Sequence, residues 1–89
     1  MKVIRRHKNF EKHFLQRITP HKKLVSQFEE RLELFIAGKL ESPLNDHPLR
    51  GKFANKRAFS VTGNIRVIYE ETMDCITFLD IGTHNQVYK

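Results

Sequence analysis

The chain has 89 residues, enough for one domain with a modest buried core. Hydrophobic residues make up 39% and charged residues 29%, which suits a globular domain rather than a disordered or membrane chain. The longest apolar run, Leu34–Ala37, is far shorter than the roughly 20 residues that span a bilayer. No secretory signal is visible, and Cys75 has no partner for an internal disulfide, so we expect a cytoplasmic location.

Positive charge is concentrated in two parts of the chain. Sixteen Lys and Arg oppose ten Asp and Glu, giving a formal charge of +6. Residues 1–23 contain eight of the basic residues and a single acid, Glu11. A second cluster follows in a stretch that contains Gly and Asn: Arg50, Lys52, Lys56 and Arg57. Localised charge of this kind predicts a polyanionic partner, nucleic acid or an acidic protein, although a merely soluble basic surface is the alternative.

The first third of the chain predicts a strand followed by two helices. Val3 and Ile4 indicate a short strand, and Phe10, Phe14 and Ile18 recur at helical spacing. These three residues predict a short amphipathic helix.

The second helix is predicted to start at Thr19-Pro20, with Thr19 as N-cap and Pro20 in the first helical position. Gly38 is suited to end it in the left-handed conformation. Its apolar stripe, which we interpret as core, comprises Leu24, Phe28, Leu32 and Phe35.

The remainder of the chain predicts a loop and three strands. Residues 39–56 are rich in Pro, Gly and Asn and are expected to be loop, with a short strand possible inside it. The hydrophobic period then changes from 3.6 to 2, with turns at Gly63-Asn64 and Met73-Asp74. The order β-α-α-β-β-β predicts an α+β fold: two helices on one face of a small, mainly antiparallel sheet, in one domain over residues 1–89.

The register of the first hairpin follows from its hydrophobic pattern. A three-residue loop at positions 62–64 places Phe59 opposite Val67 and Ser60 opposite Arg66. A two-residue loop would put the Arg66 charge on the apolar face, so burial selects the longer loop. Arg66 is therefore expected in the middle of the sheet, on the face away from the helices.

Only a few segments contain residues that are suited to catalysis. No Walker loop, G-x-G-x-x-G, C-x-x-C or H-E-x-x-H motif occurs, and the five His include no i,i+4 pair, so no metal site is expected. Three segments remain: Asp46-His47-Pro48-Leu49-Arg50-Gly51, Arg66-Val67-Ile68-Tyr69 and Ile81-Gly82-Thr83-His84-Asn85-Gln86-Val87-Tyr88. In these segments the sequence resembles the RelE/YafQ superfamily of type II toxin–antitoxin ribonucleases, and the D-H-P-L-x-G segment is similar to the YafQ branch.

This resemblance implies a metal-independent endoribonuclease without cofactor, which cuts messenger RNA on the ribosome and is held inactive by a cognate antitoxin. RNA supplies its own nucleophile, the 2′-hydroxyl, so the protein must move protons and stabilise the phosphate. The resemblance assigns the phosphate to Arg66, acid–base transfer to His84, and a counterpart role to His47. Tyr88 would stack on a base or donate its hydroxyl.

The implied RNA-binding residues are Lys52, Lys56, Arg57, Ser60 and Asn64. The last two also mark departures from the YafQ pattern. Ser60 stands where a second His would be expected on the strand, and Asn64 stands where an acid would be expected in the turn. One acid–base candidate is therefore missing.

Each candidate residue also has a structural alternative. Arg66 could form a salt bridge with Glu70 or Asp80. His47 could stabilise a turn between Asp46 and Pro48, and His84 and Tyr88 could be packing residues.

Two alternative functions compete with the ribonuclease. One is a ParE-like toxin that shares the fold but binds and inhibits DNA gyrase, and the other is an inactive toxin-fold interaction module. The pair His84 and Tyr88 favours the ribonuclease, because the ParE-like branch generally lacks it.

Overall fold

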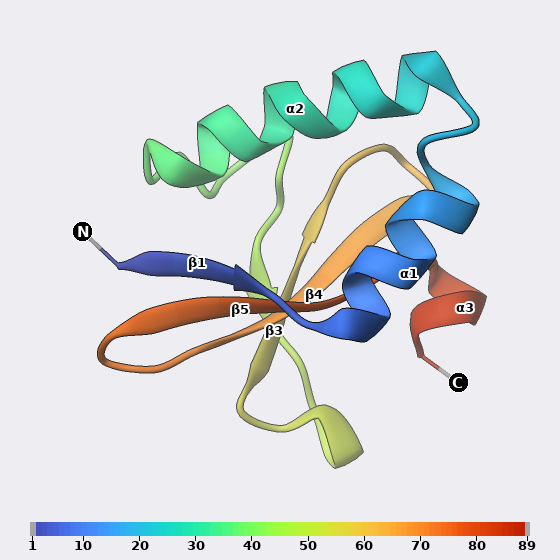
Figure 1. Cartoon of the computed structure of the whole chain (residues 1–89). Coiled ribbons are helices and arrows are strands. Elements are labelled where there is room, and N and C mark those ends of the chain that lie inside the picture. The colour runs from blue at the N-terminus through green and yellow to red at the C-terminus, as the bar shows by residue number, and fades with distance from the viewer. Residues whose placement is uncertain (1, 89) are drawn as a thin grey trace.

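The computed structural model describes residues 2–88, and within them a five-stranded sheet is partly covered by helices (Figure 1). The strands are β1 (Val3–Arg6), β2 (His47–Pro48), β3 (Lys56–Ser60), β4 (Ile65–Glu71) and β5 (Cys75–Thr83). The helices are α1 (Lys8–Arg17), α2 (Lys22–Ile36), the 3-10 turn η1 (Gly51–Phe53) and the short α3 (His84–Val87). None of the described helices is long and apolar enough to cross a membrane.

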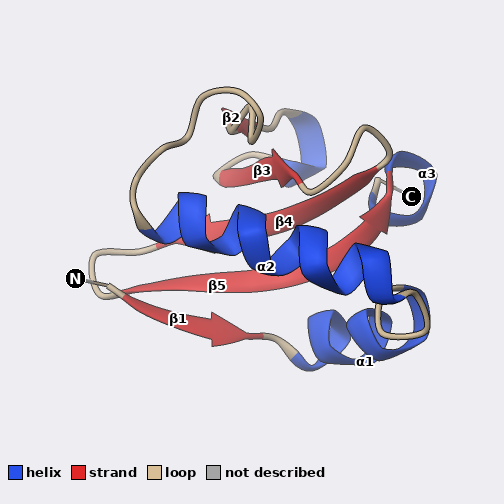
Figure 2. Cartoon of the chain, turned by 90° about the horizontal axis from the view of Figure 1, so that it is seen from above, coloured by secondary structure: helices blue, strands red, loops and turns tan. Residues whose placement is uncertain are grey.

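The sheet is mixed but mainly antiparallel. Its strand order is β1-β5-β4-β3-β2, and only the pairing of β1 with β5 is parallel. Helices α1 and α2 connect β1 to the rest of the chain, and α2 crosses one face of the sheet (Figure 2). The predicted α+β fold, with two helices on a small, mainly antiparallel sheet, is confirmed.

Aromatic residues form most of the core between the helices and the sheet. Phe10 of α1 packs with Phe28 of α2 and Phe78 of β5, at ring-centroid distances of 6.1 and 5.4 Å. Phe35, near the end of α2, packs on Phe59 of β3 at 4.8 Å. Phe10, Phe28 and Phe35 belong to the predicted helical stripes, so the apolar spacing of the sequence identified the buried faces of the two helices correctly.

The start of α2 differs from the prediction. The helix begins at Lys22, and its N-cap is His21, not Thr19. Thr19 instead donates its hydroxyl to the Leu15 carbonyl and its N–H to the Phe14 carbonyl, so it closes the end of α1. The prediction was wrong because the same hydroxyl can satisfy the last carbonyls of one helix as readily as the first amides of the next.

The end of α2 agrees with the prediction. Gly38 has a φ of +76°, and the Gly38 and Lys39 amides donate to the Phe35 and Leu34 carbonyls. This pair of bonds is a Schellman motif, which needs a left-handed residue that glycine supplies without steric cost.

The hairpin of β3 and β4 has the predicted register. Phe59 pairs with Val67 and Ser60 pairs with Arg66, while the Val61 amide donates to the Ile65 carbonyl. The face away from the main core carries a second, smaller apolar cluster of Ala58, Ile68 and Val87, with Leu49, Leu79 and Tyr88 packed against it. Arg66 alternates with the core residue Val67, so it lies on this second face.

Candidate active site

A hollow of about 330 Å³ lies on the second face of the sheet. Three of its residues are the basic side chains His47, Arg66 and His84 that the sequence singled out. The remaining lining residues are Leu49, Arg50, Phe53 and Tyr88. No carboxylate is among the described lining residues, so the hollow combines positive charge with apolar and aromatic walls.

Arg66 comes from β4, where the sheet fixes its backbone on both sides. It pairs with Ser60 of β3 and with Gly82 of β5. Within residues 2–88 its guanidinium forms no ion pair, and Asp80, one of the two acids considered as partners, instead contacts His13 and Arg17. The charge of Arg66 is therefore available to the hollow.

His84 and Tyr88 come from α3, which follows β5 directly. Thr83 caps this helix: its hydroxyl accepts from the Gln86 amide at 3.3 Å, and the Gln86 side chain accepts from the Thr83 amide at 2.8 Å. The helix was not predicted, although the spacing Thr83-x-x-Gln86 is a capping box and signals a helix start.

Burial raises the pKa of the Tyr88 phenol, and the positive charge of Arg66 opposes that shift. Arg66 and Tyr88 line the same hollow. Tyr88 also contacts the rings of His84 and Phe53, at centroid distances of 4.5 and 5.7 Å. Residues from β4, α3 and η1 thus meet in one place.

His47 enters the hollow from β2. Its Nδ1 lies 2.9 Å from the Asn45 carbonyl, which can only accept a hydrogen bond, so Nδ1 carries the proton. In the neutral ring Nε2 is then the nitrogen with the free lone pair. His47 stabilises its turn, as the structural alternative expected, and it also lines the hollow.

The neighbour of His47, Asp46, is an anchor that the sequence analysis did not identify. Its side chain is fully buried, and it accepts hydrogen bonds from Arg57 Nε at 2.7 Å and from the Tyr69 hydroxyl. Burial and the Asp46 carboxylate raise the pKa of Tyr69. This buried group ties the loop before β2 to β3 and β4, and so it fixes the position of His47.

The basic cluster after β2 does not act as one surface. Arg57 is engaged by Asp46, and that bond raises the pKa of its guanidinium. Lys56 and Arg57 line a different, wider hollow of about 770 Å³. Lys52 lies in η1, with its Nζ 5.4 Å from the ring centroid of Phe53, beside the first hollow. Arg50, which was not proposed as a site residue, lines the first hollow directly.

Ser60 and Asn64 lie near Arg66. Ser60 is the strand partner of Arg66, and its side chain is half-buried. Asn64 is exposed in the hairpin loop and lines a second hollow of about 320 Å³, which also contains Arg66 and His84. The candidate surface therefore extends from the first hollow across Arg66 to the hairpin loop. Among residues 2–88, no cluster of three or more His, Cys, Asp or Glu is arranged to hold a metal ion.

Solved structures support the same fold. YafQ from E. coli strain BL21(DE3) is 23% identical, with both chains covered over 100% and a TM-score of 0.83. The E. coli DinJ–YafQ complex contains a chain that is 24% identical, with 100% of both chains covered and a TM-score of 0.82. A metal-bound toxin from Helicobacter pylori is 18% identical over 98% of this chain and 99% of that one, with a TM-score of 0.76.

Sequence comparison gives the family. No curated protein matches the chain. The family model of YafQ, described as a bacterial toxin of type II toxin–antitoxin systems, matches residues 2–89. Because this match extends over nearly the whole chain, the protein belongs to the YafQ family of type II toxin–antitoxin toxins.

Proposed function

We propose that this toxin is an endoribonuclease that cleaves messenger RNA on the ribosome, in the cytoplasm, by attack of the 2′-hydroxyl on the adjacent phosphate. The observation that carries the proposal is the convergence of Arg66, His84 and His47 on one hollow. Two imidazoles and one permanently charged guanidinium are the groups that this reaction needs, because the RNA supplies the nucleophile.

The two histidines divide the proton transfers. One imidazole removes the proton of the 2′-hydroxyl, and the other gives a proton to the leaving 5′-oxygen. The hydrogen bond from His47 Nδ1 to the Asn45 carbonyl favours His47 as the base, because it leaves the Nε2 lone pair free in the neutral ring. His84 is then the acid, and it must be protonated at the start of the reaction.

Arg66 binds the phosphate, and Tyr88 contacts a nucleotide base of the RNA. The guanidinium of Arg66 presents several N–H donors in a fixed plane, which suits the charge that develops on the phosphate oxygens. The ring of Tyr88 stacks on a nucleotide base, and Arg50 and Lys52 at the rim of the hollow attract neighbouring phosphates. No step in this scheme uses a metal ion.

An antitoxin is the expected protein partner. A solved structure shows the E. coli DinJ–YafQ toxin–antitoxin complex, and we propose that a cognate antitoxin likewise binds this chain. The formal charge of +6 favours an acidic segment in that partner, laid over the basic hollow so that RNA is excluded.

Mapping of cuts in a reconstituted translation reaction tests the proposed activity. Wild-type protein should cut message within ribosome-bound reading frames, whereas folded Arg66→Ala and His84→Ala should leave the message intact. His21→Ala is the matched control, because His21 is an exposed N-cap whose side chain makes no capping hydrogen bond. It should cut as wild type does.

A parallel assay of DNA gyrase supercoiling decides between the alternatives. Inhibition of supercoiling by wild-type protein without cleavage of message would establish the ParE-like function. Absence of both effects would leave an inactive interaction module. Equal cleavage by wild type and by both folded variants would show that a different surface carries the activity.

A further inference from the structure

The geometry points to Arg17 as a positioning residue for the candidate active site: the guanidinium of this α1 residue holds α3 in the orientation that places His84 and Tyr88 in the hollow. The inference rests on the proposed ribonuclease function and deepens it. Arg17 does not line the hollow, so its effect is exerted through the backbone of the junction between β5 and α3.

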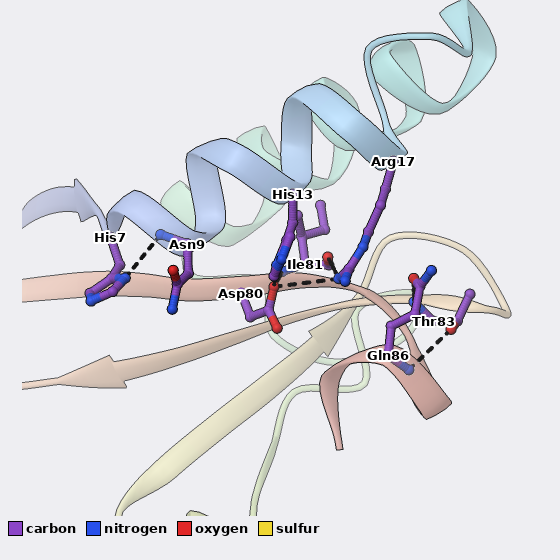
Figure 3. Close-up of polar contacts among 8 residues, drawn as sticks. All are labelled: His7, Asn9, His13, Arg17, Asp80, Ile81, Thr83 and Gln86. Carbon is purple, nitrogen blue, oxygen red and sulfur yellow. Dashed lines mark hydrogen bonds and ion pairs between the residues drawn. The ribbon is translucent and has the colours of Figure 1, made fainter. Parts of the chain in front are cut away.

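Arg17 is fixed at this junction by two contacts (Figure 3). Its Nη1 donates to the Ile81 carbonyl at 2.8 Å and lies 3.6 Å from Oδ1 of Asp80. The same oxygen of Asp80 lies 2.6 Å from Nδ1 of His13, one turn earlier on α1. The Arg17 side chain is only 22% exposed. These contacts join the end of α1 to the last residues of β5.

Gly82 allows this close approach. A Cβ atom on Gly82 would lie 2.6 Å from Arg17 Nη1, 2.6 Å from Gln86 Oε1 and 3.1 Å from Gln86 Cβ. Arg17 and Gln86 therefore occupy the space that any side chain at position 82 would take. The Arg17 guanidinium and the Gln86 side-chain amide both lie against the backbone of Gly82.

Gln86 connects this patch to the catalytic candidates. Its side chain accepts from the Thr83 amide and completes the capping box that starts α3. A helix of four residues has too few internal hydrogen bonds to hold its own position, so its orientation depends on the groups around its first turn. His84 is the first residue of that turn, and Tyr88 follows at its end.

Direct contact between Arg17 and RNA is the competing explanation, and it predicts a different kinetic effect. A residue that binds substrate changes KM, whereas one that aligns the acid lowers kcat. The low exposure of Arg17 and its bond to a main-chain carbonyl favour alignment. Misplacement of a reacting group by about 1 Å can cost about 10²-fold in rate.

The test compares full-length wild type with Arg17→Met, which keeps the apolar stem of the side chain and removes the guanidinium. We expect kcat for cleavage of message to fall by about 10- to 100-fold with little change in KM. NMR should show shifted amide signals for residues 83–88 and a weakened contact between the rings of His84 and Tyr88. Lys12→Met is the matched control, because it removes an exposed charge from the same helix and should leave kcat and these signals unchanged.

Two further variants sharpen the test. Arg17→Lys keeps one donor for the Ile81 carbonyl and should recover part of kcat. Gly82→Ala should displace Arg17 and Gln86 and reproduce the loss. Combined with Arg17→Met, it should add less than its effect alone, because the two changes break the same contact. If Arg17→Met does not fold, Arg17→Lys carries the comparison of kcat and α3 signals against wild type.

Unchanged α3 signals and wild-type kcat in folded Arg17→Met, or in Arg17→Lys if only that variant folds, would overturn the inference. A rise in KM with unchanged kcat would also overturn it and assign Arg17 to RNA binding. If wild type itself does not cleave RNA, the proposed function fails. In that case the α3 signals alone decide whether Arg17 positions the helix: shifted signals support it, and unchanged signals refute it.

Discussion

The rings of His84 and Tyr88 lie 4.5 Å apart, tilted by 59°, at the two ends of α3. The ring of Phe53 in η1 packs against Tyr88 at an interplanar angle of 82°. A ring at position 88 therefore supports the imidazole of His84 and forms part of the wall of the hollow. This arrangement separates two possible contributions of Tyr88, its aromatic face and its hydroxyl.

Tyr88→Phe should retain most of the cleavage activity, whereas Tyr88→Ala should lose it. The ring of Tyr88 contacts the rings of His84 and Phe53, so the ring is the part that we expect to contribute. Loss of base stacking should weaken RNA binding by about 1–3 kcal/mol in Tyr88→Ala. Affinity for a short single-stranded RNA and single-turnover rates measure the two effects separately. A large loss of rate in Tyr88→Phe would instead assign a function to the hydroxyl.

The buried hydrogen bond between Tyr69 and Asp46 predicts a pH dependence of stability. Burial and the carboxylate raise the pKa of Tyr69 above its ordinary value of 10.0. Above that pH the unfolded chain loses the phenolic proton while the folded chain keeps it, so the free energy of unfolding should fall as pH rises from 10. Below pH 10 the contribution of Tyr69 is fully present.

Tyr69→Phe tests this dependence. The variant should be less stable at neutral pH, because Asp46 loses one of its two hydrogen-bond donors, by about 1–2 kcal/mol. Its decline in stability above pH 10 should also be shallower than in wild type. Urea unfolding at several pH values measures both quantities. Parallel pH curves for the two proteins would show that Tyr69 does not titrate with a raised pKa in the folded state.

The salt dependence of RNA binding should show whether Lys52 and Lys56 contact RNA phosphates. Lys52 lies beside the first hollow and Lys56 lines the wider hollow of about 770 Å³, whereas Arg57 is engaged by Asp46. Replacing Lys52 and Lys56 by Met should weaken affinity and reduce the slope of log K against log salt. On single strands the reduction should be about 0.7 for each phosphate that the protein no longer neutralises. Arg57→Met should in addition lower stability, since it removes a partner of a buried carboxylate.

A charge-matched control uses the N-terminal end of α2. Replacing the exposed pair Lys22 and Lys23 by Met removes the same formal charge without touching either hollow, or the contacts of Arg17. For this double variant, the slope of log K against log salt on a short single-stranded RNA should equal that of wild type. Equal slopes for both double variants and wild type would show that Lys52 and Lys56 are ordinary surface.

Local pattern was enough to predict much of the fold and the surroundings of Arg66. The register of β3 and β4 depends on residues only a few positions apart, so the alternation of apolar side chains determines it. That register puts Arg66 on the second face of the sheet. The pairing of Arg66 with Gly82 then brings the end of β5 next to Arg66, and His84, two residues after Gly82, lines the same hollow.

The groups that hold these residues in place could not be predicted in the same way. Asp46 meets Arg57 and Tyr69 from 11 and 23 positions away, and Arg17 meets Ile81 from 64 positions away. Such contacts depend on tertiary packing and leave no periodic signal in the sequence. The wrong start of α2 has a different origin: Thr19 could cap either helix, and only the packed structure distinguishes the two.

The proposed reaction makes its own prediction about the substrate. Attack by the 2′-hydroxyl leaves a 2′,3′-cyclic phosphate and a 5′-hydroxyl, and it cannot occur at a 2′-deoxyribose. Replacing the ribose at the cut site by 2′-deoxyribose should therefore abolish cleavage there while barely changing affinity. His84→Gln and His47→Gln should each slow the chemical step by about 10²–10⁴-fold on the ribose substrate, the usual loss for a missing acid or base. Single-turnover cleavage of matched ribose and deoxyribose messages, with end-group analysis of the products, measures each of these effects. Cleavage at the deoxyribose position, or products that carry a 5′-phosphate, would mean that water or another group is the nucleophile. The roles given to His47 and His84 would then have to be abandoned, even though both line the hollow beside Arg66.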